Sequence, residues 1–201
     1  MADPELVDTL DGVAGVVAAG GVIIIPTDTV YGLACGADSV AAVARIEGLK
    51  RRPPDLELSL LAGTRSDLHG LVRMSDTAER LAERFWPGAL SLICPLGKGK
   101  RLAIPRRAAT LMVRVPAHPL LRRLLEMTGP LASTSANRHG ESPAATADEA
   151  RVALGADVDA LLDGGPGAGL ASTIIETLST PPRVLREGLI LIDELAPYLG
   201  G

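Results

Sequence analysis

Apolar residues recur at three- and four-residue spacing in several segments of this chain, which is the spacing of one face of an α-helix. In residues 39–49 the apolar positions are Val40, Val43, Ile46 and Leu49. Glycine or proline follows several of these segments and ends the pattern. The pattern predicts helices over residues 6–19, 39–49, 76–85, 118–127, 146–154 and 193–199.

Short apolar runs rich in β-branched residues lie between the predicted helices. Residues 22–25 are wholly apolar, as in a strand that is buried on both faces, and Pro26 ends the run. Strands are predicted over residues 22–25, 58–61, 89–94, 111–115, 158–162, 172–176 and 183–185. Because strands and helices alternate with no long linker between them, we expect one α/β domain over residues 1–201, with its core at 10–190 and helices packed on a mixed sheet.

Composition narrows the classes of function. Apolar residues make up 47% of the 201 residues and the net charge is −4, so a broadly basic nucleic-acid binder is excluded and any phosphate site must be a local cluster. Cys35 and Cys94 lie in apolar segments and indicate two buried thiols, with a disulfide left open. The acidic start of the chain has no features of a signal peptide, and no apolar run reaches the ~20 residues of a membrane span. We therefore expect a soluble, cytoplasmic protein.

Two candidate sites follow the first predicted strand and the second predicted helix. Residues 26–33 place two hydroxyls, a carboxylate and a phenol after a buried strand, where ligands of α/β sheets bind. A polar turn without function is the alternative. Lys50 and Arg52 end a helix, where cations interact favourably with the helix dipole but can also clamp an anion.

Further candidates lie later in the chain. Residues 133–137 form a loop of small polar residues that could bind phosphate or carboxylate oxygens, and the glycines of residues 163–169 allow close approach of the backbone to a ligand or simply form turns. Arg114 interrupts an apolar strand, so we expect it to face a polar cavity. His69, His118 and His139 are scattered and favour structural or surface roles.

Several familiar active-site patterns are absent from the sequence. It contains no G-x-x-x-x-G-K-[ST] loop, no G-x-S-x-G elbow and no kinase signature. Basic and hydroxyl-bearing loops without a nucleophile–base pair favour the positioning and charge neutralisation of a phosphorylated ligand.

In order along the chain, these segments resemble the YrdC/YciO family, from about residue 21 to residue 188. The resemblance rests on the stretch PTDTVYGL at residues 26–33, K-x-R at Lys50 and Arg52, W-P-G at 86–88, V-R-V-P at 113–116, H-P at 118–119, S-x-N at Ser135 and Asn137, S-T at 172–173, and R-x-G at Arg186 and Gly188. Leu56 and Glu57 stand where the family usually has Lys or Asn followed by Pro. Leu61 stands where some relatives have histidine.

The resemblance implies an α/β fold with a twisted mixed sheet around a deep basic concavity. It also implies the activity of a threonylcarbamoyl-AMP synthase: L-threonine, bicarbonate or CO2, and ATP with Mg2+ give threonylcarbamoyl-AMP and pyrophosphate. It implies that no protein side chain binds the metal. Partner proteins would then transfer the threonylcarbamoyl group to adenosine 37 of tRNA.

The resemblance also implies roles for individual residues. Those matching catalytic positions are Lys50, Arg52, Ser135 and Asn137. Those matching ATP contacts are Arg52, Leu56, Thr110, Ser135, Pro143 and Arg186. Those matching threonine contacts are Thr29, Tyr31, Leu61, Arg114, Ser133 and Ser172.

Two rival interpretations stay open at this point. One is a YciO-like paralogue that binds double-stranded RNA or a nucleotide in the same basic cavity with little synthase activity. The other is a carbamoyl-adenylate domain like that of hydrogenase maturation proteins. The sequence lacks the acylphosphatase and zinc-finger segments that accompany such a domain.

Overall fold

The helices begin where hydroxyl side chains can cap them. The computed structural model describes residues 7–50, 58–99, 102–104, 109–138 and 140–199. Thr9, Ser75 and Thr146 each accept a hydrogen bond from a backbone N–H in the first turn of the helix that follows. The α-helices are α1 (Leu10–Ala18), α2 (Val40–Lys50), α3 (Asp76–Phe85), α4 (Pro119–Thr128), α5 (Ala147–Leu154) and α6 (Ile192–Leu199), with short 3-10 helices η1 (Arg65–Leu68) and η2 (Gly155–Asp157).

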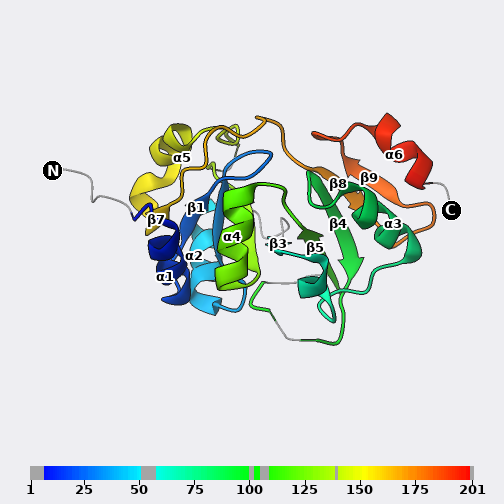
Figure 1. Cartoon of the computed structure of the whole chain (residues 1–201), viewed down its shortest axis with the longest axis horizontal. Coiled ribbons are helices and arrows are strands. Elements are labelled where there is room, and N and C mark those ends of the chain that lie inside the picture. The colour runs from blue at the N-terminus through cyan, green and yellow to red at the C-terminus, as the bar shows by residue number, and fades with distance from the viewer. Residues whose placement is uncertain (1–6, 51–57, 100–101, 105–108, 139, 200–201) are drawn as a thin grey trace.

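The strands of the described residues form one mixed sheet that runs the length of the molecule (Figure 1). They are β1 (Ile23–Ile25), β2 (Gly32–Gly36), β3 (Ser59–Leu61), β4 (Leu90–Pro95), β5 (Thr110–Arg114), β6 (Leu131–Ser135), β7 (Ala160–Leu161), β8 (Thr173–Glu176) and β9 (Arg183–Arg186). Their order is β7-β1-β2-β6-β3-β5-β4-β8-β9. The pairs β7–β1, β3–β5 and β4–β8 are parallel, and the other pairs are antiparallel. The predicted mixed α/β sheet is confirmed.

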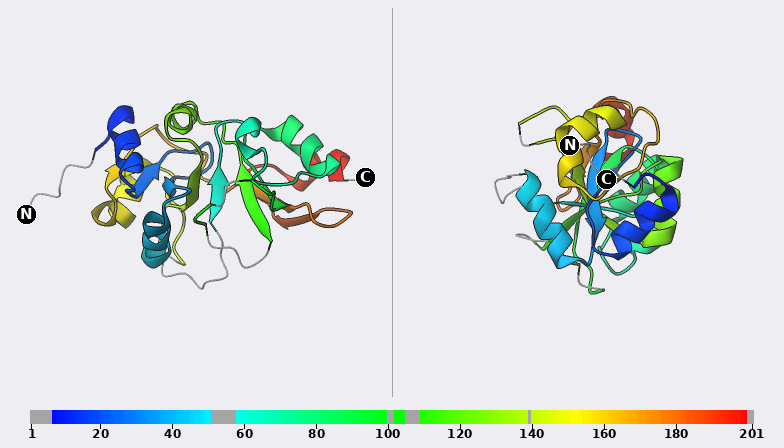
Figure 2. Two further views of the ribbon diagram at one scale, coloured as in Figure 1. Left: turned by 90° about the horizontal axis from the view of Figure 1, so that it is seen from below. Right: turned by 90° about the vertical axis from the view of Figure 1, so that its left-hand side faces the viewer.

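Alternate residues of the strands feed two hydrophobic clusters, one on each face of the sheet. Ile24 belongs to the larger cluster, with α2, α3, α5 and α6, whereas its neighbours Ile23 and Ile25 belong to the smaller cluster, with α1 and α4. Figure 2 shows α2 on the opposite side of the sheet from α1 and α4. The smaller cluster covers only one end of its face, so polar residues of the central strands on that face are left without a helix over them.

Two segments predicted as loops are strands. Residues 130–137 were expected to be a loop because they are rich in hydroxyls, but β6 occupies most of this segment and pairs with β2 on one side and β3 on the other. β2 was also missed, because its glycine-flanked sequence carries little strand signal. The helix predicted from residue 6 begins at Leu10, because Val7 instead forms a β-bridge with Ala160 of β7.

The two cysteines do not form a disulfide. Cys35 and Cys94 are buried free thiols, as predicted.

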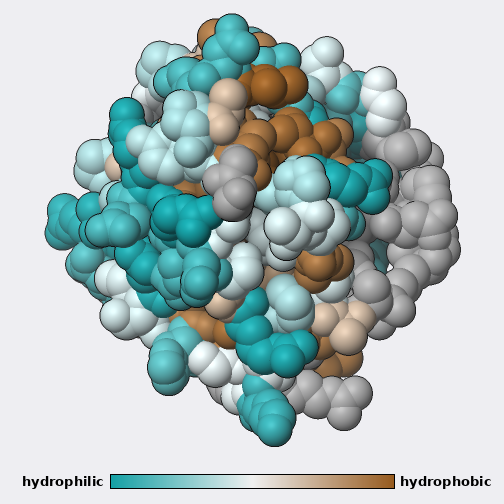
Figure 3. Space-filling view, turned by 90° about the vertical axis from the view of Figure 1, so that its right-hand side faces the viewer, coloured by the Kyte–Doolittle hydropathy of each residue, from teal (hydrophilic) through white to brown (hydrophobic). Residues whose placement is uncertain are grey.

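At the end of the molecule that carries β9 and α6, apolar side chains reach the surface (Figure 3), among them Leu185 and Leu191. Arg183 and Arg186 stand at the two ends of the outer strand β9. Charged side chains on an edge strand oppose pairing with another chain.

Candidate active site on the polar face of the central strands

A cavity of about 220 Å3 opens on the face of the sheet that carries α1 and α4, over the central strands that these helices do not cover. Two-residue alternation explains its lining, because Ser59 and Leu61, Met112 and Arg114, and Ser133 and Ser135 are each two positions apart on neighbouring strands. The lining residues are Thr27, Thr29, Val30, Tyr31, Gly32, Ser59, Leu61, Ser91, Met112, Arg114, Ser133, Thr134, Ser135, Pro143, Ala171, Ser172, Ile174 and Arg186.

The loop between β1 and β2 supplies an ordered chain of hydroxyls to this cavity. Thr27 Oγ1 donates to Val30 O at 2.6 Å, so it can only accept in its 2.8 Å contact with Thr29 Oγ1. Thr29 Oγ1 in turn accepts from Arg114 Nη1 at 2.9 Å. The hydrogen of Thr29 therefore points to Thr27, and what this oxygen can offer a ligand is a lone pair, which suits an N–H or O–H donor.

Arg114 is the buried cation of the cavity, as the sequence predicted. Its guanidinium donates from Nε to Gly88 O at 2.9 Å, and its Nη2 lies 2.7 Å from Asp28 Oδ1. The residue is only 5% exposed. Burial lowers the pKa of Arg114, while the charge of Asp28 acts in the opposite direction. A buried arginine held by fixed acceptors is a prepared partner for a carboxylate or phosphate.

Arg186 brings a second guanidinium to the same cavity. It donates to Ser172 O from Nε at 3.0 Å and from Nη2 at 2.8 Å, and Ser172 Oγ contacts Ser91 Oγ at 2.9 Å. Burial lowers the pKa of Arg186 first, and the charge of Arg114 lowers it further. Two like charges that face one cavity repel each other, and a bound anion relieves that repulsion. Among its described lining residues there is no carboxylate.

Lys50 and Asn137 lie beside the cavity rather than in its lining. The Lys50 ammonium is 2.8 Å from Ser135 O and 2.8 Å from Asn137 Oδ1, and it also contacts Asn137 O. Asn137 Nδ2 donates to Arg138 O and Glu141 O. In this structure the buried lysine therefore holds the turn that follows β6, and with it the backbone of Ser135.

The structure brings most of the predicted site residues together. Those that line the cavity are Thr29, Tyr31, Leu61, Arg114, Ser133, Ser135, Pro143, Ser172 and Arg186. Thr110 does not line it, since it begins β5, four residues or about 13 Å along the strand from Arg114. Arg52, Leu56 and Glu57 lie outside the described residues. The roles of all these residues toward ATP and threonine stay predictions.

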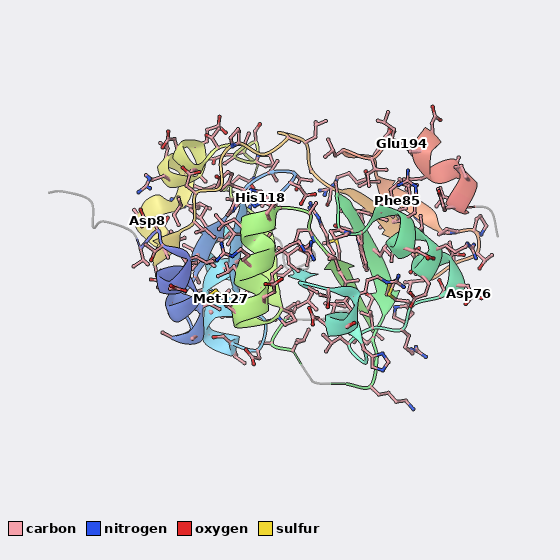
Figure 4. The ribbon with its side chains drawn as sticks, viewed as in Figure 1. Asp8, Asp76, Phe85, His118, Met127 and Glu194 are labelled. Carbon is pink, nitrogen blue, oxygen red and sulfur yellow. The ribbon has the colours of Figure 1, made fainter. Side chains whose placement is uncertain are left out.

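The glycine-rich segment 163–169 braces the β1–β2 loop from behind. Tyr31 Oη contacts Asp163 Oδ1 at 3.0 Å and Gly165 O at 2.8 Å, and a Cβ on Gly167 would lie 2.6 Å from Thr29 O. Glycine is thus required for close packing, and this segment does not line the cavity. Burial raises the pKa of Tyr31 to about 12. His118, labelled in Figure 4, lies just before α4 and reaches the same segment, with Nε2 3.2 Å from Gly164 O.

Sequence reasoning missed some cavity residues. Ser59, Ser91 and Met112 line the cavity, and the contact of Asp28, which belongs to the candidate segment 26–33, with Arg114 was not predicted. Ser59 and Ser91 interrupt apolar strands in the same way as Arg114 does, and the same criterion could have found them.

No group of three or more His, Cys, Asp or Glu side chains that could bind a metal ion occurs in the part of the chain that the structure describes. In that same part, no helix is long and apolar enough to cross a membrane.

These features define an α/β protein with a polar cavity in which two arginines face a row of hydroxyls. The family described as Telomere recombination, named for Sua5, YciO and YrdC, matches residues 15–188, and the chain belongs to it. The resemblance to the YrdC/YciO family is thereby confirmed.

Relatives and solved structures agree with this assignment. A threonylcarbamoyl-AMP synthase of Stenotrophomonas maltophilia is 39% identical over 187 residues, 91% of this chain and 97% of the relative. The crystal structure of Pyrococcus abyssi Sua5 complexed with L-threonine matches with a TM-score of 0.89 and 33% identity, over 95% of this chain and 57% of that one. Escherichia coli YciO matches with a TM-score of 0.80 and 29% identity, over 90% of this chain and 89% of that one.

Proposed function

We propose that this protein is a threonylcarbamoyl-AMP synthase. The observation that carries the proposal is the buried guanidinium of Arg114 on a hydroxyl-lined cavity that also holds Arg186, in a chain whose relatives are named as synthases. The reaction consumes L-threonine, bicarbonate or CO2, and ATP. The threonine amine adds to CO2 as a carbamate, a carbamate oxygen attacks the α-phosphorus, and pyrophosphate leaves as the bond between the α-phosphorus and the bridging oxygen breaks.

Threonine fits the half of the cavity beside the β1–β2 loop. The L-threonine in the Pyrococcus abyssi structure supports this class of ligand. Arg114 would bind the threonine carboxylate by charge-assisted hydrogen bonds, and the lone pair of Thr29 would accept from the amine or the hydroxyl. Ser133 and Ser172 add hydroxyls on the neighbouring strands. An amine that is held by an acceptor and not by a carboxylate can lose its proton and act as a nucleophile.

The phosphates of the nucleotide would lie on the side of the cavity beside Arg186. Nucleotidyl transfer builds negative charge on the α-phosphate and on the leaving pyrophosphate, and fixed cations and donors stabilise that charge. We assign this role to Arg186, which lines the cavity, and to the turn at Ser135 and Asn137, which Lys50 holds. Arg52, Leu56, Thr110 and Pro143 remain predicted ATP contacts. Mg2+ would enter with ATP, since it binds phosphate oxygens and keeps several waters.

One assay tests the proposal directly. The protein is incubated with ATP labelled in the γ-phosphate, bicarbonate and L-threonine, and pyrophosphate release is measured with and without threonine. We expect release that requires both threonine and bicarbonate, with threonylcarbamoyl-AMP as the second product. Absence of release, combined with binding of double-stranded RNA or of nucleotide alone, would favour the YciO-like alternative. Tests of downstream partners that modify tRNA follow only from a positive result.

A further inference from the structure

Asp28 is the one charged group among the described residues that contacts Arg114. Its Oδ1 lies 2.7 Å from Arg114 Nη2, and the same oxygen accepts from the backbone N–H of Ala117 at 3.1 Å. Asp28 belongs to the β1–β2 loop, whereas Ala117 lies between β5 and α4. One carboxylate thus ties these two loops together and fixes the arginine between them.

Asp28 acts from outside the cavity. It is not a lining residue, although Thr27 and Thr29 on either side of it are. The Asp28 side chain is 18% exposed, against 6% for Arg114. Contact with a ligand in the cavity therefore falls to the guanidinium, and the carboxylate supports the guanidinium from behind.

We propose that Asp28 is a positioning residue that orients the Arg114 guanidinium toward the carboxylate of the amino-acid substrate. This inference rests on the proposed function. The contacts with Gly88 O and Thr29 Oγ1 engage two of the five N–H groups of the guanidinium, and Asp28 Oδ1 forms an ion pair with Nη2 that lacks hydrogen-bond geometry. Among the described residues, one N–H on Nη1 and both on Nη2 are left by these two hydrogen bonds, and two N–H groups are what bidentate binding of a carboxylate requires.

The Asp28 carboxylate supports Arg114 by its charge as well as by its position. Arg114 and Arg186 both line the cavity, and the charge of Arg114 adds to burial in lowering the pKa of Arg186. Without the Asp28 carboxylate this repulsion acts on an arginine that only neutral acceptors hold. The side chain would then populate other rotamers, and ordering it again on binding would cost affinity.

The test is Asp28→Asn, which keeps the shape and the acceptor for Ala117 but removes the charge. We expect the Kd of L-threonine measured by calorimetry, and the KM for threonine, to rise about tenfold or more, as for loss of a charge-assisted bond. The KM for ATP should stay within about twofold. Asp28→Glu, which restores the charge on a longer side chain, should recover part of the threonine affinity.

Asp159→Asn is the matched control. Like Asp28, Asp159 uses one carboxylate oxygen to pair with an arginine, Arg45, and to accept from a backbone N–H, that of Val22, but it lies away from the cavity. It should leave the threonine affinity unchanged.

Each outcome supports or overturns the inference. Equal threonine affinity in Asp28→Asn and wild type overturns the inference and leaves the proposed function untouched. So does a parallel loss of kcat and of both substrate affinities with a lowered melting temperature, which indicates a merely structural role. A wild-type protein that does not bind threonine overturns the proposed function, and the inference with it.

Discussion

The two faces of the central strands differ in chemistry although they are built from the same residues in alternation. Leu60, Leu92 and Val113 are 0% exposed and pack in the larger hydrophobic cluster. Their neighbours Ser59, Ser91 and Arg114 face the cavity on the other side. The difference teaches that one strand can serve stability and binding separately, because successive side chains point to opposite faces. Substitutions on the two faces should therefore give separable effects.

On the polar face, the largest expected effect comes from the double variant Arg114→Met with Asp28→Asn, which removes the cation without leaving an unpaired carboxylate. We expect kcat/KM for threonine to fall at least about 100-fold, as for loss of a buried charged contact. The melting temperature should move by only a few degrees. The matched control, Arg138→Met with Asp157→Asn, removes an ion pair outside the cavity. Equal losses of activity in the two double variants would contradict the assignment.

On the apolar face, Leu92→Ala should have the opposite signature. The side chain is fully buried, so the free energy of unfolding should fall by about 2–5 kcal/mol. Urea unfolding measures this loss, and the KM values of the folded enzyme should stay at wild-type levels. The adjacent variant Ser91→Ala should cost no more than about 1 kcal/mol, because only the contact with Ser172 is lost. A change in KM without a change in stability for Leu92→Ala would contradict the separation of the two faces.

Lys50, at the end of α2, holds the turn after β6. Lys50→Met removes the ammonium from Ser135 O and from Asn137. We expect the KM for ATP to rise about tenfold, from loss of roughly 1.5 kcal/mol of support to this turn, with a smaller change in threonine binding. Steady-state kinetics with each substrate varied in turn measure the two effects, and exposed Lys98→Met is the control. A larger effect on threonine than on ATP would mean that the turn held by Lys50 supports threonine binding instead.

The last expected effect concerns Tyr31, which contacts the glycine-rich segment, and it appears only at alkaline pH. The folded state raises the pKa of Tyr31 from its ordinary value of 10.0 to about 12, so it favours the protonated phenol. This contribution to stability is full below pH 10 and is lost as the pH rises through 12. Unfolding measured from pH 8 to 12 should show a weaker decline for Tyr31→Phe than for wild type. Tyr198→Phe, which leaves Tyr31 in place, serves as the control, and an unchanged decline in Tyr31→Phe would refute the assignment.

Periodicity predicted most of the elements but not the short polar strands. Helical spacing identified α3 with its bounds, and apolar runs identified β1, β4 and β5. β6 was predicted as a loop because Ser and Thr are typical of turns. Pairing with strands on both of its sides decides its structure, and such long-range pairing is not visible in the local pattern.

The site was predictable where a polar residue interrupts an apolar strand, as Arg114 does. It was not predictable where the function of a residue depends on a distant partner. Nothing near Asp28 in the sequence indicates that it contacts Arg114, 86 positions away. Likewise, the helix end at Lys50 indicates an anion clamp or a dipole contact, whereas the buried contact with Asn137 arises only from tertiary packing.

The central claim is that threonine binds in the cavity on the polar face with its carboxylate on Arg114. A crystal structure of the protein with L-threonine and a non-hydrolysable ATP analogue tests it most directly. We predict carboxylate oxygens within hydrogen-bonding distance of Arg114, the amine near Thr29, and the α-phosphate on the side of Arg186. Threonine bound elsewhere, or an Arg114 that contacts only protein groups in the ternary complex, would contradict the account.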